Sequence, residues 1–233
     1  MAEAAAPAVP DRPAAEHPLL EAGDRLTRSE FERRYAACPH LKKAELVEGV
    51  VYLPSPVRYE SRGRPHALLL GPLLLYAAHT PGVGIADNAT VRLDFANDVQ
   101  PDVLLRIEAP PAAQSSVADD GYLEGAPELV AEIAASSASY DLHDKLRVYR
   151  RNGVREYLVW RTHEHRIDCY RLAADAYHPL PLDDGIIRSR VFPGLHLDVD
   201  ALLRGDAAAA LATAQIGLDS AEHRAFEARS SGD

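Results

Sequence analysis

The chain contains 233 residues and carries a net charge of −10, from 25 basic and 35 acidic side chains. A hydrophobic content of 47% with 26% charged residues is typical of a globular protein and excludes a wholly disordered chain. No apolar stretch reaches the ~18 residues of a membrane-spanning helix, and the N-terminus lacks the basic flank and apolar segment of a secretory signal. Two cysteines, Cys38 and Cys169, are too few for a disulfide framework or a zinc cage, so we expect reduced thiols and a cytoplasmic protein.

Three regions differ in composition. Residues 1–23 are rich in Ala and Pro and are expected to form a disordered arm. Residues 204–233 form an Ala-rich, low-complexity tail with too few bulky side chains to anchor a helix firmly. Between them, residues 24–203 have the pattern of one domain. Residues 141–171 carry eight basic and five acidic side chains, which allows a basic face on an otherwise acidic protein.

The expected elements follow one another along the domain. A helix is predicted at residues 27–37, where Thr27 and Glu30 form a capping box that satisfies backbone N–H groups. A strand-forming stretch at 45–53 precedes a helix at 65–79 that is apolar on nearly all sides and therefore buried. The remaining elements are expected in the order strand 84–95, strand 99–107, strand 128–134, helix 141–152, strands 154–160, 166–172 and 177–182, and helix 199–203. This order predicts an α/β fold with a mixed central β-sheet flanked by helices.

Two carboxylates stand out because they lie in hydrophobic strands. Asp102 follows Pro101, and Glu132 lies within Leu-Val-Ala-Glu-Ile-Ala. Burying an unpaired carboxylate costs several kcal/mol, so each acid should meet a cation, a hydrogen-bond donor or an exposed strand end. On adjacent strands the two acids would suit Mg²⁺, which lowers the pKa of a bound water and neutralises charge on a phosphate. A salt bridge to a neighbouring residue is the structural alternative for either acid.

Other catalytic motifs are missing from the sequence. It contains no GxxxxGK[ST] phosphate loop, no GxGxxG turn, no GxSxG elbow and no HExxH pair. ATP hydrolysis, nicotinamide chemistry and serine esterase chemistry therefore lack their usual sequence support.

Several short motifs occur in a fixed order within residues 26–203. They are ELVEGV at 45–50, His66 before an apolar helix, QPD at 100–102, PELVAEIA at 127–134, and then Lys145, Tyr149 and GVREYLVW at 153–160. In this order they resemble the Uma-type (Uma-two) restriction endonuclease family of the PD-(D/E)XK nuclease superfamily. The resemblance implies a restriction-endonuclease-like fold. It also implies a metal-dependent endonuclease that hydrolyses nucleic-acid phosphodiester bonds, with DNA as the expected substrate.

The resemblance also assigns roles to individual residues. It makes Asp102 and Glu132 the ligands of Mg²⁺ or Mn²⁺, with Glu48 as a third acid. The superfamily's usual lysine position, two residues after the second acid, is occupied by Ala134. The family resembled uses a lysine on the following helix, which corresponds to Lys145, and its long side chain can reach the strand end. Lys145 would orient the attacking water and counter charge in the transition state.

Basic residues near Lys145 are candidates for contacts with nucleic acid. Arg147, Arg150 and Arg151 follow on the same helix, and Arg forms bidentate bonds with phosphates. His66 is a further candidate for binding phosphate or assisting at the site. A solvated helix face is the alternative for the arginines, and a hydrogen-bonded helix-start residue is the alternative for His66. Cleavage of a duplex usually needs two active sites, which suggests a homodimer.

Two other functions fit the same residues. Ala-Ser-Ser-Ala at 135–138 replaces the family's Ser-Pro-Ser-Thr, and the chain is acidic. Both observations favour a catalytically inactive nuclease fold that binds DNA or protein as a regulatory module. The acidity would also permit a metal-dependent hydrolase of another phosphate ester.

Overall fold

The computed structural model describes residues 19–53, 56–135 and 141–230, so most of the predicted arm at 1–23 lies outside the described residues. The helical elements are α1 (Arg28–Ala36), α2 (Arg64–Ala78), α4 (Leu146–Asn152), α5 (Val199–Arg204), α6 (Ala207–Leu218) and α7 (Ala221–Ser230), with π-helical turns η1 (Tyr59–Gly63) and η2 (Asp141–Lys145). Within this part of the chain, no helix combines the length and the apolar character needed to cross a bilayer.

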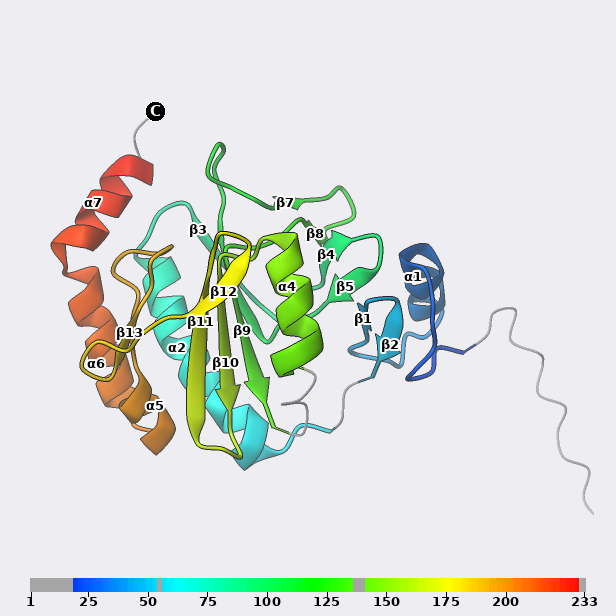
Figure 1. Cartoon of the computed structure of the whole chain (residues 1–233), viewed down its shortest axis with the longest axis horizontal. Coiled ribbons are helices and arrows are strands. Elements are labelled where there is room, and N and C mark those ends of the chain that lie inside the picture. The colour runs from blue at the N-terminus through cyan, green and yellow to red at the C-terminus, as the bar shows by residue number, and fades with distance from the viewer. Residues whose placement is uncertain (1–18, 54–55, 136–140, 231–233) are drawn as a thin grey trace, which may run out of the picture.

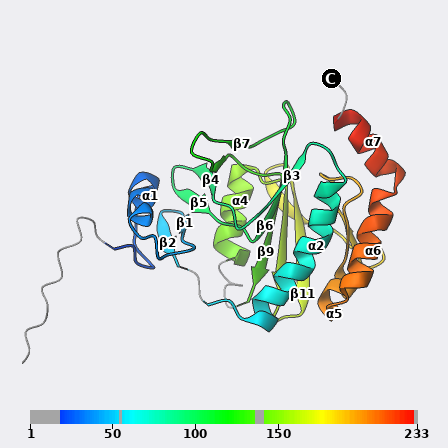
Figure 2. The same cartoon turned by 180° about the vertical axis from the view of Figure 1, so that it is seen from behind.

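A mixed sheet forms the centre of the fold, with the strand order β12-β11-β10-β9-β6-β3. Its strands are β3 (Val83–Asp87), β6 (Val103–Ile107), β9 (Leu129–Ala134), β10 (Glu156–Arg161), β11 (Arg166–Ala173) and β12 (Ala176–Pro179). Strands β9 and β10 run parallel, while the other neighbours are antiparallel. Helix α2 covers one face of this sheet and α4 covers the other (Figures 1 and 2). The predicted α/β class with a mixed sheet and flanking helices is confirmed.

A second sheet lies beside the first and has the strand order β2-β1-β5-β4-β8-β7. Its strands are β1 (Glu45–Val47), β2 (Val50–Tyr52), β4 (Val91–Asp94), β5 (Asn97–Val99), β7 (Ser116–Val117) and β8 (Leu123–Glu124). Helix α1 packs on β1 and β2 through Phe31, Leu46 and Val51 (Figure 1). A separate antiparallel pair is formed by β13 (Ile186–Arg188) and β14 (His196–Asp198).

Three stretches that were each predicted as one strand contain two. Residues 45–53 form a hairpin because Glu48 and Gly49 adopt positive φ angles of 50° and 75°, as a two-residue turn requires. Residues 84–95 break at Asn88, and residues 99–107 break around Pro101. In the last two cases the chain passes from one sheet to the other, which the pattern of apolar residues does not reveal. Residues 100–102 therefore connect the two sheets.

Strand alternation determines which residues face α4. Successive side chains of a strand point to opposite faces. On β9 the core residues Leu129, Ala131 and Ile133 pack on the α2 side, so Glu132 points to the α4 side. Val103 of β6 is paired with Ala131, which places the preceding Asp102 opposite Glu132 on the neighbouring strand.

The structure corrects the prediction of a separate tail at residues 204–233. Helix α6 packs against α2 and β14, and it buries Ala210, Ala214 and Leu218. Its small residues let backbones approach closely, since a Cβ added at Gly217 would lie only 2.1 Å from the carbonyl oxygen of Gly194. The leucines of α2 supply the apolar bulk that the segment lacks, so the segment is anchored by what it packs against.

The second sheet also buries an acid. Asp98 of β5 is 3% exposed, and Glu32 of α1 lies beside it. Burial and the charge of Glu32 raise the pKa of Asp98 to about 7, against the opposing effect of Arg28 and Arg92. Asp98 therefore takes up a proton in the folded protein at a pH where the unfolded chain would be ionised.

The variant Asp98→Asn removes this titration and should change how stability depends on pH. Because the folded pKa of Asp98 is raised, its contribution is fully present below the ordinary value of 3.8 and is lost as the pH rises through about 7. The free energy of unfolding of the variant minus that of wild type should increase by up to about 4 kcal/mol between about pH 4 and about pH 8. Urea unfolding across this range measures the difference.

Asp94→Asn is the matched control, with the opposite sign. Burial raises the pKa of Asp94, but hydrogen bonds from Ala96, Asn152 and Asn97 outweigh burial and lower it. That variant should lose stability relative to wild type as the pH rises through the ordinary range of a carboxyl group. A pH-independent difference for Asp98→Asn would contradict the assignment.

Candidate active site

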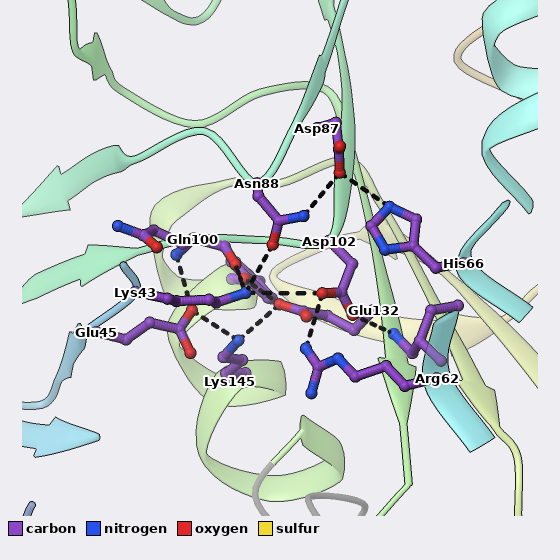
Figure 3. A network of polar contacts seen from close by, with 12 residues as sticks. Lys43, Glu45, Arg62, His66, Asp87, Asn88, Gln100, Asp102, Glu132 and Lys145 are labelled. Atoms are coloured by element: carbon purple, nitrogen blue, oxygen red, sulfur yellow. Dashed lines mark hydrogen bonds and ion pairs between the residues drawn. The ribbon is translucent and has the colours of Figure 1, made fainter. Parts of the chain in front are cut away.

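A cluster of buried charged groups lies where the two sheets meet, in contact with the helical segment η2–α4 (Figure 3). Glu45 comes from β1, Asp102 is the last residue of the connection between the sheets, and Glu132 comes from β9. Lys145 is the last residue of η2. These four side chains are between 1% and 7% exposed, so their charges must be satisfied within the protein.

Lys145 joins the two glutamates. Its Nζ donates hydrogen bonds to Glu45 Oε1 and Glu132 Oε1, both at 2.8 Å. Tyr149 lies four residues further along the helix, on the same face, and its hydroxyl donates to Glu132 Oε1 at 2.8 Å. Burial and the nearby charge of Glu132 raise the pKa of Tyr149 well above its usual value, so the hydroxyl stays a donor. The backbone N–H of Gln100 donates to Glu45 Oε1 at 2.7 Å.

Asp102 meets different partners. Its Oδ2 accepts from the backbone N–H of Ile133 at 2.7 Å, and its Oδ1 accepts from Arg62 Nη2 at 2.8 Å. Lys43 Nζ lies 3.6 Å from the same Oδ1 and donates to the carbonyl oxygen of Gln100 at 2.6 Å. Burial alone would raise the pKa of Asp102, but Lys43, Arg62 and the Ile133 N–H outweigh it and lower the pKa. Asp102 is therefore an anion held by two cations.

Other buried acids of the protein are satisfied in another way. Glu128 accepts from the backbone N–H groups of Ile107 and Gln114, at 2.7 and 2.9 Å. Glu156 accepts from the Ser189 hydroxyl and the Arg190 N–H, both at 2.6 Å. Backbone groups are fixed by the fold, whereas the cations at Asp102 and Glu132 sit on long flexible side chains. The partners of the cluster acids can therefore be exchanged for a ligand at lower structural cost.

A cavity of about 540 Å³ opens beside Asp102. Lys43, Arg62 and His66 contribute to its wall. His66, near the start of α2, has its Nε2 2.9 Å from Asp87 Oδ1 (Figure 3). The cavity thus joins a buried carboxylate to several groups that can carry positive charge.

The structure brings together three of the predicted site residues, Asp102, Glu132 and Lys145, and separates Glu48 from them. Glu48 lies in the turn between β1 and β2, where its carboxylate accepts from Arg147 and Arg151 at 3.1 and 3.3 Å. The hairpin turns this side chain outward. Glu45 of the same hairpin reaches Lys145 instead.

The three predicted nucleic-acid arginines lie on the outer side of α4. Arg147 also donates to Asp144 at 2.8 Å, and Arg151 lies 3.4 Å from Asp94. Arg150 donates to the carbonyl oxygen of Asp175 at 2.9 Å. A role in binding phosphate stays a prediction for all three.

Sequence reasoning missed Glu45, Lys43 and Arg62. One signal for Glu45 was present, because the pair Glu48-Gly49 is compatible with a hairpin turn, and this leaves Glu45 as the acid inside the strand. Lys43 and Arg62 carried no local signal. They reach Asp102 from 59 and 40 positions away along the chain, a proximity that only the fold creates.

The carboxylates of the cluster can be compared with what a divalent metal ion requires. In the described residues no three His, Cys, Asp or Glu side chains are grouped as metal ligands. Mg²⁺ commonly takes one or two protein carboxylates and completes its shell with water, so the opposed pair Asp102 and Glu132 suits it, or Mn²⁺, chemically. An ion at Asp102 Oδ1 would replace Arg62 there.

Comparison with known proteins agrees with this fold. A family model, Uma2, described as "Putative restriction endonuclease", matches residues 28–200. The chain belongs to the Uma2 family. The predicted resemblance is thereby confirmed.

A solved structure is similar to the chain as well. It is described as a "putative nuclease belonging to DUF820" from Anabaena variabilis, with a TM-score of 0.55 and 12% sequence identity, over 74% of this chain and 97% of that chain. At this identity the likeness shows a common fold. No curated protein sequence matches the chain.

Lys145→Met should lower the stability of the protein. The substitution leaves Glu45 and Glu132 buried beside each other without their shared cation, which is expected to cost about 3–5 kcal/mol of unfolding free energy near neutral pH. Urea unfolding in the presence of a chelator measures this loss. The exposed Lys42→Met is the matched control, with an expected change within about 0.5 kcal/mol. Equal stability of the two variants would show that the cluster does not need the cation.

Proposed function

We propose that this Uma2 protein is a metal-dependent endonuclease that hydrolyses phosphodiester bonds of nucleic acid, with DNA as its substrate. The observation that carries the proposal is the register of β6 on β9, which pairs Val103 with Ala131 and so brings Asp102 to the level of Glu132, with Lys145 bound to Glu132. The open cavity beside Asp102 gives a phosphate access to this carboxylate. Membership of the Uma2 family supports the same activity.

Each side chain has a distinct task under this proposal. Asp102 and Glu132 would hold Mg²⁺, which when bound supplies an acidified water and neutralises charge on the phosphate. Lys145, fixed by Glu45, would orient the attacking water and counter developing negative charge. Tyr149 positions the Glu132 carboxylate through its hydroxyl.

Arg62 and Lys43 complete the proposed site. Both lie at the wall of the cavity and now neutralise Asp102. An incoming phosphate offers Arg62 a second anionic partner that it can bind through two parallel hydrogen bonds. We infer that Arg62 moves from the carboxylate to the phosphate when substrate and ion bind.

A second candidate function is a nuclease-fold module that binds nucleic acid or protein without cleaving it. The observation in its favour is that both oxygens of Asp102 already have partners in the protein. If Arg62 never leaves Asp102, no ion binds and no hydrolysis follows.

Nicking of supercoiled plasmid in the presence of Mg²⁺ tests the proposed activity. Asp102→Asn and Glu132→Gln keep the size of each side chain and remove its charge, so each should slow nicking at least about 100-fold, as loss of an electrostatic group in an active site does. Glu164→Gln alters an exposed acid in the β10–β11 turn and should nick like wild type. A chelator should abolish nicking by all active variants. Activity that Asp102→Asn and Glu132→Gln retain would refute the assignment.

The variants Glu45→Gln and Glu48→Gln show, in the same plasmid-nicking assay, which of the two acids of the β1–β2 hairpin contributes to activity. The contact of Glu45 with Lys145 predicts the larger loss of nicking for Glu45→Gln.

Calorimetric titration with Mn²⁺ decides between the two candidate functions. Arg62→Gln removes the cation that competes at Asp102, so this variant should bind Mn²⁺ about tenfold more tightly than wild type, a difference of about 1.4 kcal/mol. Arg64→Gln, an exposed change two residues away, is the control and should bind as wild type does. Failure of both wild type and Arg62→Gln to bind any ion would support the non-catalytic module.

A further inference from the structure

A second cavity, of about 550 Å³, lies between α1, the loop at residues 38–42 and strands β4 and β5. Its wall contains two tyrosine rings, an arginine, two carboxyl groups and an amide: Glu32, Tyr35, Arg92, Asp98, Gln100 and Tyr122. The active site described above uses only the backbone of Gln100 from this set. The remaining groups have no role in that site.

The second cavity adjoins the active-site cavity. Three residues line both: Leu41, Lys42 and Asn88. Gln100 connects the two as well, since its backbone N–H bonds Glu45 while its side-chain Nε2 donates to Thr90 Oγ1 at 2.9 Å. Asp102 follows two residues later, ~6.6 Å along an extended chain. A nucleotide with its phosphate at Asp102 would therefore have its base within reach of the second cavity.

The wall offers flat surfaces for stacking. The Arg92 guanidinium lies 4.5 Å from the centre of the Tyr122 ring. Glu32 and Asp120, each 2.8 Å away, hold this guanidinium in place. Nucleobases stack on aromatic rings and on arginine planes, and such stacking contributes strongly to binding of unpaired bases. The ring of Tyr35 belongs to the same cavity.

The wall also offers one carboxyl oxygen that accepts no hydrogen bond within the described part of the protein. Asp98 is 3% exposed, and its Oδ1 has no hydrogen-bond partner in the part of the chain that the structure describes. A buried acceptor without a partner is costly and favours a ligand that brings an N–H group. Because the pKa of Asp98 is raised to about 7 beside Glu32, the two carboxyl groups carry less than two negative charges near neutral pH. Repulsion of a phosphate-bearing ligand is reduced accordingly.

We propose that this second cavity binds a guanine base of the substrate strand next to the phosphate at Asp102, an inference that rests on the proposed nuclease function. Guanine presents the adjacent donors N1–H and N2–H₂ beside the acceptor O6. Glu32 and Asp98 accept from the two donors, and the Lys42 ammonium group donates to O6. Adenine, cytosine and thymine do not present two adjacent donor groups. The bound base must be unpaired, so the strand is single or the nucleotide is extruded from a duplex.

Calorimetric titration of the full chain with the four deoxynucleoside 5′-monophosphates, in the presence of a chelator, tests the base pocket without any cleavage. All four ligands carry the same phosphate, so differences in affinity report the base alone. We expect deoxyguanosine monophosphate to bind at least about tenfold more tightly than the other three. Asp98→Asn and Glu32→Gln should each remove most of this preference. Glu124→Gln, which lies 3.6 Å from Arg92 but does not line the cavity, should keep it.

The outcomes separate this inference from the proposed function. Equal affinity for all four nucleotides, or a preference that both Asp98→Asn and Glu32→Gln retain, would overturn the base pocket even if the protein cleaves DNA. A guanine preference that both variants lose, in a protein that nicks no plasmid, would support the base pocket and reject the nuclease activity. Asp98 is buried, so Asp98→Asn could unfold the protein. Glu32 is partly exposed, and Glu32→Gln then tests the base pocket in a folded protein. With an active enzyme, mapped cleavage positions should be enriched at guanine in wild type and should lose this enrichment in the two variants.

Discussion

The sharing of one buried ammonium group by two carboxylates is the interaction on which the site depends. Glu45 belongs to the second sheet, Glu132 to the central sheet, and Lys145 to the helical segment that crosses them. Two buried anions this close would repel each other strongly, so the lysine between them is a condition for bringing these elements together. The groups best suited to act on a phosphate are therefore also groups that join the parts of the fold.

The segment at residues 100–102 has a similar double use. It leaves the second sheet after β5 and enters the central sheet at β6, so its successive residues contact different parts of the fold. The backbone of Gln100 supports Glu45, its side chain lies in the second cavity, and Asp102 faces the active-site cavity. A short connection between sheets thus places a candidate metal ligand next to a candidate base pocket. The candidate metal site and the candidate base pocket are therefore adjacent because residues 100–102 contribute to both.

Two kinds of buried acid can be told apart only in the fold, by the groups that bind them. Glu128 and Glu132 lie four residues apart in the same hydrophobic segment and are equally buried. The first is satisfied by backbone N–H groups, whereas the second is bound by the side chains of Lys145 and Tyr149. Sequence reasoning selected Glu132 because family motifs matched it. The same reasoning chose Glu48 over Glu45, because the hairpin that reverses their exposure was read as one continuous strand.

The sequence by itself determined the fold class, the helices around Phe31, Leu73 and Val148, and the choice of Asp102 and Glu132 as candidate acids. Each of these depends on a local pattern of strand alternation, helix period or motif order. The tertiary structure alone decided that Lys43 and Arg62 neutralise Asp102, that helix α6 packs onto α2, and that Asp98 meets Glu32. These contacts join residues far apart along the chain. They depend on how the two sheets and the helices pack in space, and packing of that kind leaves no periodic trace in the sequence.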